Sequence, residues 1–571
     1  MIKKLMYLSI LPMLAALAAC TESGDTIVSK TVDSPNTLTV ASSNVELAAG
    51  VESFELSVDS RGEAWKTIVT PAEHDWLRIM PTESDGSDAS VYFLAEEDNT
   101  TYEPRSVEVL FYSEHGSRKV TVSQSGMPIE KNGLPARWYF TENEMRASGW
   151  VANRVLFANA GEGRSLASVS AVGADGRNPV CALSTAYKTS AAAMKMFTGD
   201  CLLFTVPVKS LAAGTDIDFM GTFGATDNSA PKYWMCEIFD GGEWREPEAS
   251  DIKTAADGTR YSFYIKNFSS YQHTTFVQTF TLSETVRDGV LKIRCRAVGS
   301  INGGGSTLLP TAAGGIYMPS HEFHLATICA YEGIAAEDTK KVLLLGNSFT
   351  HYFCTAWKLK ELARSQGHRL DMRINIKGSQ TFANHLALEL SQAAINEGGY
   401  DYAFLQEQSQ AHAKYYADPV SNGQLLTDMR NLSAQVMQHS PSCRVVLENT
   451  WAFPKSGWDG HGSSSAFEAA LLAGAKAIAA ADTNVACVSP IGVAFDKAYA
   501  SGITDLWYTD SKHPNINGAY LKACVNYLVL FGEQFDDNAA DCGVAADTAA
   551  KLRAIAEDVV LGHESEYGIE R

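Results

Sequence analysis

The sequence lacks the motifs by which many proteins hold metals, phosphates or dinucleotides. Its cysteines form no CxxC pair, its histidines form no HExxH spacing, and it contains neither a glycine-rich phosphate loop nor a dinucleotide-binding fingerprint. His385, His412 and His461 lie in the C-terminal third, but their spacing does not support a zinc site. We therefore expect a protein that works without a metal or other cofactor.

Positive charge is also scarce. The 46 Lys and Arg residues face 66 Asp and Glu residues, a net charge of −20, so the long-range field repels nucleic acid and we expect no nucleic-acid partner. The hydrophobic fraction of 45% and charged fraction of 20% exclude a mostly disordered, collagen-like or polytopic membrane chain. A length of 571 residues exceeds the roughly 250–300 residues that one hydrophobic core serves, which predicts several domains.

The N-terminus has the pattern of a signal peptide. Lys3 and Lys4 precede an apolar run over residues 5–17, which is too short for a comfortable membrane span. Residues 17–20, Leu-Ala-Ala-Cys, resemble a bacterial lipobox, and this resemblance implies cleavage before Cys20 and lipidation of Cys20. We therefore expect that the protein is exported and that the lipid on Cys20 anchors it to the cell envelope, at the outer membrane. A plain secretory signal or an uncleaved anchor, the alternatives, would also export the chain.

Polar residues 21–35 contain few large apolar side chains and are predicted to be a tether. Ten cysteines follow Cys20, too few in so long a chain for a dense disulfide scaffold. The five between positions 181 and 329 would allow a bridge, but we favour small buried hydrophobic residues for most of the ten.

Residues 36–127 are predicted to form a small β-sandwich. Apolar side chains alternate over residues 107–111 and 120–122, and a polar turn at 113–117 joins these runs, which is a hairpin pattern. Trp65, the Asp-Trp-Leu step at 75–77, Arg105 and the closing run at 120–124 resemble a BACON domain, a module of Bacteroidetes lipoproteins.

Residues 134–332 are predicted to form a second all-β domain. Strand-like runs at 201–208, 261–265, 275–281 and 290–295 alternate with Gly, Asn, Asp and Ser clusters, and the size suits a jelly-roll sandwich of the kind that often binds carbohydrate. Its tryptophans would stack on sugar rings if they are exposed, or fill the core if they are not. These tryptophans are Trp138, Trp150, Trp234 and Trp244.

Residues 340–571 show a different pattern, in which short apolar runs alternate with helical stretches. Strands are predicted at 342–345, 372–376, 402–405, 444–447 and 485–488, and helices at 357–366, 384–395 and 467–481. This alternation predicts βαβ units on a parallel sheet, with ligands bound beyond the carboxyl ends of the strands.

Two short motifs in this region carry residues suited to acyl transfer. Gly-Asn-Ser-Phe-Thr at 346–350 follows a predicted strand, which places Ser348 at the rim of the sheet. A serine hydroxyl needs a base that is oriented by a third group. Asp-Ser-Lys-His-Pro at 510–514 supplies both, because Asp510 can hold the ring nitrogen of His513 that faces away from the serine.

The two motifs, GNSFT first and DxxHP last, resemble the SGNH (GDSL-like) hydrolase superfamily over residues 340–533, in a Bacteroidetes-type branch. The resemblance implies a three-layer, flavodoxin-like α/β fold with Ser348 as nucleophile, His513 as general base and then acid, and Asp510 as its orienting partner. It also implies an oxyanion hole formed by the backbone N–H of Ser348, by Gly378, and by a third donor. The run at 405–410 is similar to the Gln-Gly-Glu run of some sugar acetylesterases, which favours the side chain of Gln406 over Gln410.

Other residues that follow predicted strands are candidates for binding substrate. Trp451 would form a wall of the site and Glu448 would hold its loop, unless both simply pack inside; Trp507 lies next to the second motif.

Together these features predict two β-sandwich domains followed by an SGNH-type hydrolase domain. The resemblance implies a serine esterase that removes acetyl or similar acyl groups from carbohydrate through an acyl-enzyme. The alternative is a glycan-binding or adhesion lipoprotein whose hydrolase domain is vestigial, with the β domains holding the glycan.

Overall fold

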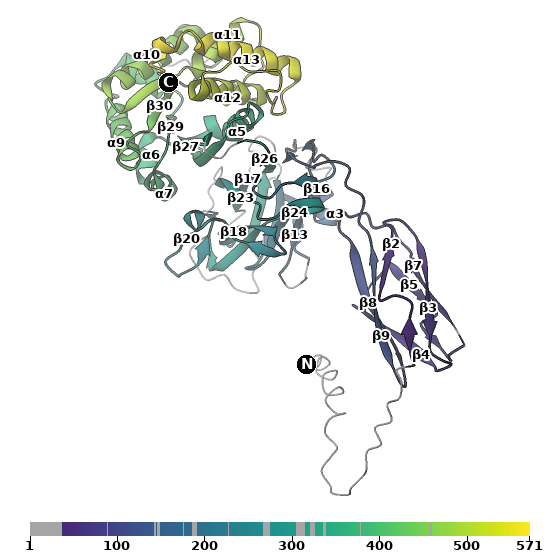
Figure 1. Ribbon diagram of the computed structural model, residues 1–571. Helices are drawn as coiled ribbons and strands as arrows, with labels where there is room; N and C mark the ends of the chain where they lie inside the picture. The colour runs from purple at the N-terminus through teal and green to yellow at the C-terminus, as the bar shows by residue number, and fades with distance from the viewer. Residues whose placement is uncertain are drawn as a thin grey trace. The chain divides into compact units, whose positions relative to one another are not determined.

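A computed structural model describes residues 37–570, apart from positions 73, 88, 142–143, 145–148, 175, 177, 185–190, 226–227, 266–273, 304–313, 320–325, 335–337, 377 and 456–459 (Figure 1). The predicted signal peptide with Cys20 and the predicted tether lie outside the described residues. The chain divides into two compact units, Met1–Met127 and Pro128–Arg571.

The first unit is all-β. Its strands are β1 (Thr39–Val40), β2 (Asn44–Leu47), β3 (Ser53–Asp59), β4 (Trp65–Thr70), β5 (Leu77–Met80), β6 (Glu83–Ser84), β7 (Ser90–Ala95), β8 (Arg105–Ser113) and β9 (Ser117–Gln124). They form two sheets, in the orders β1-β3-β7-β5 and β2-β9-β8-β4-β6. Side chains alternate between buried and exposed along β8, and the buried ones of both sheets share one core around Trp65 and Phe93.

The second unit begins with another all-β region. Its strands are β10 (Ala136–Trp138), β11 (Val155–Phe157), β12 (Ala160–Gly161), β13 (Ser168–Val172), β14 (Val180–Ser184), β15 (Ala191–Met196), β16 (Cys201–Leu211), β17 (Asp216–Ala225), β18 (Pro231–Asp240), β19 (Glu243–Arg245), β20 (Lys253–Thr254), β21 (Arg260–Tyr261), β22 (Phe263–Tyr264), β23 (Thr274–Thr281), β24 (Val286–Asn302), β25 (Gly314–Pro319) and β26 (Ala326–Tyr331), with a short helix α3 (Trp150–Asn153) and a 3-10 turn η1 (Ala249–Asp251). The two large sheets run β12-β10-β26-β17-β25-β15-β14 and β11-β13-β16-β24-β18-β19, with β23 and β22 at their sides. The predicted runs at 201–208, 275–281 and 290–295 lie within β16, β23 and β24, whereas the run at 261–265 is split between the short strands β21 and β22.

Three of the four tryptophans in this region belong to its core. Trp138, Trp150 and Trp234 are fully buried, so the packing alternative holds for them. The indole N–H of Trp138 donates to Leu156 O (2.9 Å) and that of Trp234 to Pro231 O (3.0 Å), which removes the cost of burying them. Trp244 is partly exposed, but the Arg294 guanidinium lies over its ring at 4.1 Å.

All ten cysteines after Cys20 are free and buried in the structure, as small hydrophobic residues are. Cys236 and Cys295 lie opposite each other on β18 and β24 with their sulfur atoms 4.0 Å apart.

The C-terminal region is α/β. Its strands are β27 (Lys340–Gly346), β28 (Leu370–Ile376), β29 (Tyr402–Leu405), β30 (Arg444–Glu448) and β31 (Val485–Ser489). Its helices are α4 (Ser348–His351), α5 (Thr355–Ser365), α6 (Phe382–Ala387), α7 (Glu389–Glu397), α8 (Ala411–Ala417), α9 (Gln424–His439), α10 (Ser464–Ala481), α11 (Ile491–Ala500), α12 (Ile516–Phe531), α13 (Ala546–Val560) and α14 (Glu564–Tyr567). The strands pair in parallel in the order β28-β27-β29-β30-β31. Because β28 lies on one side of β27 and the later strands lie on the other, the order in which the chain adds strands reverses at β27. Such a reversal is where parallel sheets bind ligands.

The helices predicted for this region differ from the structure at one place. The predicted helix 384–395 is in fact α6 and α7, because the extended backbone of Leu388 (φ −77°, ψ 122°) ends one and begins the other.

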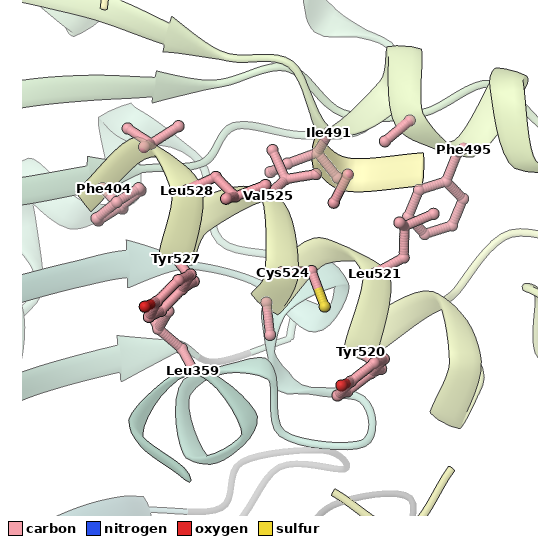
Figure 2. Close-up of a cluster of buried hydrophobic side chains, with 14 of the residues drawn as sticks. Leu359, Phe404, Ile491, Phe495, Tyr520, Leu521, Cys524, Val525, Tyr527 and Leu528 are labelled. Carbon is pink, nitrogen blue, oxygen red and sulfur yellow. The ribbon is translucent and has the colours of Figure 1, made fainter. Parts of the chain in front are cut away.

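The apolar helix α12 lies inside the α/β region, and Figure 2 shows its Tyr520, Leu521, Cys524 and Val525 among side chains from α5, β29 and α11. α10 is long and apolar enough to cross a membrane by length and composition, but its apolar side packs into this domain.

Ion pairs join the second β region to the α/β region. Lys360 of α5 pairs with Asp218 of β17 at 2.7 Å, with side chains 5% and 2% exposed, and Arg373 of β28 pairs with Asp251 at 3.2 Å. Arg137 pairs with Glu361, and Arg369 with Asp216, in the same junction. The two segments predicted as separate domains form one compact unit with largely separate cores, although Met220 of β17 belongs to the core of the α/β region.

Replacing Asp218 tests the strength of this junction. Asp218→Ala leaves the Lys360 ammonium buried without its carboxylate, so we expect the free energy of unfolding of the second unit to fall by about 3–5 kcal/mol in urea. The control is Lys119→Ala, which removes an exposed pair with Glu108 in the first unit and is expected to change stability by less than about 1 kcal/mol. Equal effects of the two substitutions would contradict a tightly locked junction.

Candidate active site

The first motif folds into a tight strand-to-helix turn. β27 ends at Gly346, and Asn347 caps the short helix α4 by accepting from the Phe349 N–H (3.1 Å). Ser348 is therefore the first helical residue, and its own N–H has no acceptor within the helix. The turn presents the Ser348 hydroxyl and N–H together at the carboxyl edge of the sheet.

The second motif forms another tight turn, directly before α12. The Tyr508 N–H donates to His513 O (2.8 Å), and Ser511 adopts a left-handed conformation with φ of 59°. Trp507 and Pro514 form a β-bridge at the base of this turn. The loop is closed on itself, so Asp510 and His513 are held at a fixed separation.

The two turns meet although 165 residues separate them. The Ser348 hydroxyl lies 2.7 Å from Nε2 of His513, and Nδ1 of His513 lies 2.5 Å from a carboxylate oxygen of Asp510. A carboxylate only accepts, so Nδ1 carries the ring proton and Nε2 is left to accept from the serine. The structure thus brings together the three residues that the motifs predict.

The environment keeps Asp510 ionised. Burial alone would raise its pKa, but the hydrogen bond from His513 and the backbone N–H groups of Lys512 (2.9 Å) and His513 (3.0 Å) lower that pKa to about 2. The carboxylate is therefore charged whenever the imidazole needs a counter-charge.

Aromatic rings surround the imidazole. Tyr352 stacks on the ring of His513, with centroids 4.2 Å apart and planes at 14°, and Phe349 lies 5.2 Å from it. Tyr508 meets Tyr352 edge to face at 5.5 Å. Tyr352 was not predicted from the sequence, although its place four residues after the serine puts it on the next turn of the chain.

Gln406 does not have the role predicted for it. Its Nε2 donates to Asn347 Oδ1 (2.8 Å) and to Glu407 O, and its Oε1 accepts from the Asn347 N–H (3.1 Å) and the Thr350 hydroxyl (3.0 Å). Both amide hydrogens are used and the side chain is 1% exposed, so Gln406 braces the nucleophile turn instead of donating to an oxyanion. Gln410 lies farther along, at the start of α8.

The loop after β28 is tied to the same turn. Asn347 Nδ2 donates to Gln380 O (2.9 Å), and Gln380 Nε2 donates to Gly378 O (3.1 Å). Glu407 accepts from the N–H groups of Phe382 (2.7 Å) and Gln408 (2.6 Å), and burial raises the pKa of Glu407 to about 7. The position of Gly378 beside this turn is compatible with its predicted part as second oxyanion donor, which stays a prediction.

The predicted substrate-binding residues lie mostly beneath the site. Trp451 and Glu448 are each 1% exposed, so Trp451 forms no wall that substrate can touch and both residues pack inside, as the alternative prediction had it. Trp451 instead stacks on Phe495 (4.4 Å) and donates its indole N–H to Lys512 O (3.0 Å), inside the second turn. Glu448 pairs with Lys522. Trp507 is partly exposed and packs edge to face against Phe495 at 5.8 Å.

The three histidines noted in the sequence, His385, His412 and His461, are buried or packed against neighbouring residues. His385 is buried, accepts at Nδ1 from the Ser391 hydroxyl (2.8 Å) and donates from Nε2 to Gly346 O (3.2 Å), just before the nucleophile turn. Burial lowers the pKa of His385 and that of His412 to about 4, and His461 stacks on Phe467. Within the described residues, His, Cys, Asp and Glu form no group of three that could hold a metal ion.

Comparison with known proteins assigns a family to part of the first unit. Residues 64–125 are a BACON domain, a family described as an N-terminal binding domain. The match lies within the 36–127 segment predicted from the sequence. No curated protein matches the chain.

Some solved structures resemble part of this chain. A DUF4886 family protein from Bacteroides uniformis is 17% identical with a TM-score of 0.34, over 40% of this chain and 100% of its own. The acetylxylan esterase Axe2 from Geobacillus stearothermophilus is 14% identical (TM-score 0.24; 34% of this chain, 93% of its own), and phospholipase A1 from Streptomyces albidoflavus is 16% identical (TM-score 0.24; 33% and 98%). At these identities the likeness concerns the fold alone, and it favours no substrate.

Trp451→Phe tests the link between the indole and the second turn. The variant keeps an aromatic ring but leaves Lys512 O without its donor, so we expect a loss of about 1–3 kcal/mol in stability and a lower kcat for any reaction that uses Ser348 as nucleophile. Trp234→Phe is the matched control, since it removes a similar buried bond in the second β region. It should lower stability and leave kcat unchanged; equal kcat values for the two variants would refute the link.

Tyr352→Leu and Tyr352→Phe test the stacking on His513. An aromatic contact is worth about 0.5–1.5 kcal/mol, which corresponds to roughly 2- to 12-fold in rate. We expect the leucine variant to lose kcat by about this factor and the phenylalanine variant to stay within about twofold of the original chain. The stacking would have no catalytic part if steady-state kinetics gave the same kcat for leucine and phenylalanine.

Proposed function

We propose that this protein is a serine esterase of the SGNH type, acting on acyl groups carried by carbohydrate. The observation that carries the proposal is the hydrogen-bonded series from the Ser348 hydroxyl through the imidazole of His513 to the Asp510 carboxylate. The three groups have the order and the hydrogen-bond distances that nucleophilic attack requires.

In the first half-reaction Ser348 Oγ attacks the ester carbonyl carbon while its proton passes to Nε2 of His513. The imidazolium that forms is stabilised by the ionised Asp510, whose pKa of about 2 keeps it charged. The tetrahedral intermediate collapses, the C–O bond to the alcohol breaks, and the alcohol leaves with the proton of His513. The product is an acyl group on Ser348.

In the second half-reaction water attacks the acyl-enzyme. His513 Nε2 takes a proton from that water, and the carboxylic acid leaves as the proton returns to Ser348 Oγ. In both halves the carbonyl oxygen becomes negative and needs donors that are already in place. The Ser348 N–H, free at the start of α4, is one, and we assign Gly378 N–H as the second.

Acylated carbohydrate is the substrate class we favour. Tyr352 and Tyr508 are partly exposed beside His513, and such rings suit the apolar face of a sugar. Export and anchoring through Cys20, together with glycan binding by the β regions, belong to the same proposal. Such an arrangement would place the esterase among glycans at the cell envelope.

Hydrolysis of p-nitrophenyl acetate and butyrate by the chain lacking residues 1–20 tests the proposal. We expect Ser348→Ala to lower kcat/KM by at least about 10³-fold, since the nucleophile is lost. Ser465→Ala makes the same change on the exposed first turn of α10 and should leave the rate unchanged. Acetate release from acetylated xylan and fatty-acid release from phospholipid would then separate the substrate classes.

Equal rates for Ser348→Ala and the original chain would remove Ser348 from the mechanism. Tight glycan binding with no Ser348-dependent turnover of any ester would favour the binding-protein alternative instead.

A further inference from the structure

A buried ion pair that the proposed reaction does not use lies beneath the nucleophile turn. Lys522 of α12 and Glu448 of β30 place Nζ and Oε2 2.6 Å apart, with side chains 0% and 1% exposed. Burial lowers the pKa of Lys522, and Glu448 opposes that shift. A buried ion pair often contributes no more stability than an apolar pair of the same volume, so stability alone does not account for it.

Every polar atom of the pair has a partner with a fixed direction. Asn526 Nδ2 donates to the second oxygen of Glu448 (2.8 Å), and the Ser489 hydroxyl donates to Asn526 Oδ1 (2.7 Å). Lys522 Nζ also donates to the Thr350 hydroxyl at 2.6 Å. An ammonium only donates, so this bond fixes the Thr350 oxygen as acceptor and turns its hydrogen away from Lys522.

The orientation of the Thr350 hydroxyl in turn orients the side chains next to Ser348. The Thr350 hydroxyl donates to Gln406 Oε1 (3.0 Å), which orients the amide so that Nε2 faces Asn347 Oδ1 (2.8 Å). Gln406 Oε1 also accepts from the Asn347 N–H (3.1 Å). Asn347 precedes Ser348 and caps α4, so the ammonium sets the sense of the side-chain hydrogen bonds that join Thr350, Gln406 and Asn347.

The same ammonium also lies near Trp451, the residue that donates a hydrogen bond to the turn at 510–514. Nζ of Lys522 is 5.9 Å from the centre of the Trp451 ring, which contacts Phe349 edge to face at 4.7 Å and donates to Lys512 O. One buried cluster therefore contacts the residues on either side of the serine and the turn that carries His513.

We infer that the Lys522–Glu448 pair, acting through Thr350 and Gln406, is a positioning device that aims Ser348 at His513. The inference rests on the proposed esterase function and deepens it. Lys522, Glu448 and Thr350 touch neither substrate nor reacting atoms; they are positioning residues. A misplacement of about 1 Å at a reacting group can cost roughly 100-fold in rate, so such a device acts on kcat more than on KM.

Thr350→Val is the direct test, because valine has the shape of threonine but no hydroxyl and leaves the ion pair intact. We expect kcat for p-nitrophenyl acetate to fall about 10- to 100-fold, with KM within about twofold. The rate at which a fluorophosphonate probe labels Ser348 should fall in parallel. Thr350→Ser, which keeps the hydroxyl, should restore both rates to within about threefold of the original chain.

Thr222→Val is the matched control. Thr222 is buried in the second β region, where its hydroxyl bonds that of Thr275 at 3.0 Å. This variant should lower the thermal midpoint and leave kcat and labelling unchanged. If Thr350→Val yields no folded protein, Thr350→Ala removes the same hydroxyl without placing a methyl group against the ammonium, and the same rates are measured.

The outcomes separate this inference from the proposed function. Ser348-dependent hydrolysis by the original chain, with Thr350→Val as fast as Thr222→Val, would overturn the positioning role and leave the esterase standing. Equal losses in Thr350→Val and Thr350→Ser would also overturn it, since the hydroxyl would not be the group that matters. No Ser348-dependent hydrolysis or labelling in the original chain would overturn both.

Discussion

The 2.7 Å contact between the Ser348 hydroxyl and His513 Nε2 is the constraint on which the rest of the C-terminal region depends. The two groups come from turns that are 165 residues apart in the chain, so the contact exists only if the parallel sheet and the helices between them hold their places. A serine hydroxyl is a weak nucleophile without a base in hydrogen-bond reach. The chemistry of the site is thus set by tertiary packing and not by either motif alone.

The packing that holds this contact is largely polar beneath the site and apolar around it. Asn347, Thr350 and Gln406 satisfy one another's hydrogen bonds, and His385 secures the preceding carbonyl of Gly346. Buried polar groups are costly unless all are paired, which makes a fully paired cluster rigid. The second β region adds to this rigidity, since Arg373 of the edge strand β28 pairs with Asp251, and the loop after β28 reaches Asn347 through Gln380.

The sequence was sufficient to predict the elements with regular patterns and the residues within compact motifs. The strands of the sheet follow from short apolar runs, and Ser348, Asp510 and His513 follow from the chemistry that their spacing permits. Residues such as Trp451 and Glu448 were assigned to the substrate side because they follow a strand. A position after a strand fixes the edge of the sheet at which a residue lies, but neighbours distant in sequence decide whether its side chain faces solvent or the interior.

The role of Gln406 could not be predicted for the same reason. Its side-chain amide is hydrogen-bonded to Asn347 and Thr350, which are distant in sequence. A signal for the cluster was nevertheless present. Lys522 and Asn526 stand four residues apart in the mostly apolar helix α12, and such a spacing places two polar side chains on one face. The break at Leu388 had no comparable signal, since a leucine favours continuation of a helix.

The most direct test of the account is the isolation of its covalent intermediate. The chain lacking residues 1–20 would be mixed with an excess of p-nitrophenyl acetate, quenched with acid within the first turnovers, digested and analysed by peptide mass spectrometry. We expect one acetyl group on the peptide that contains Ser348, located on that serine by fragmentation. Rapid turnover with no acetyl group on Ser348, or with the acetyl group on another residue, would contradict it.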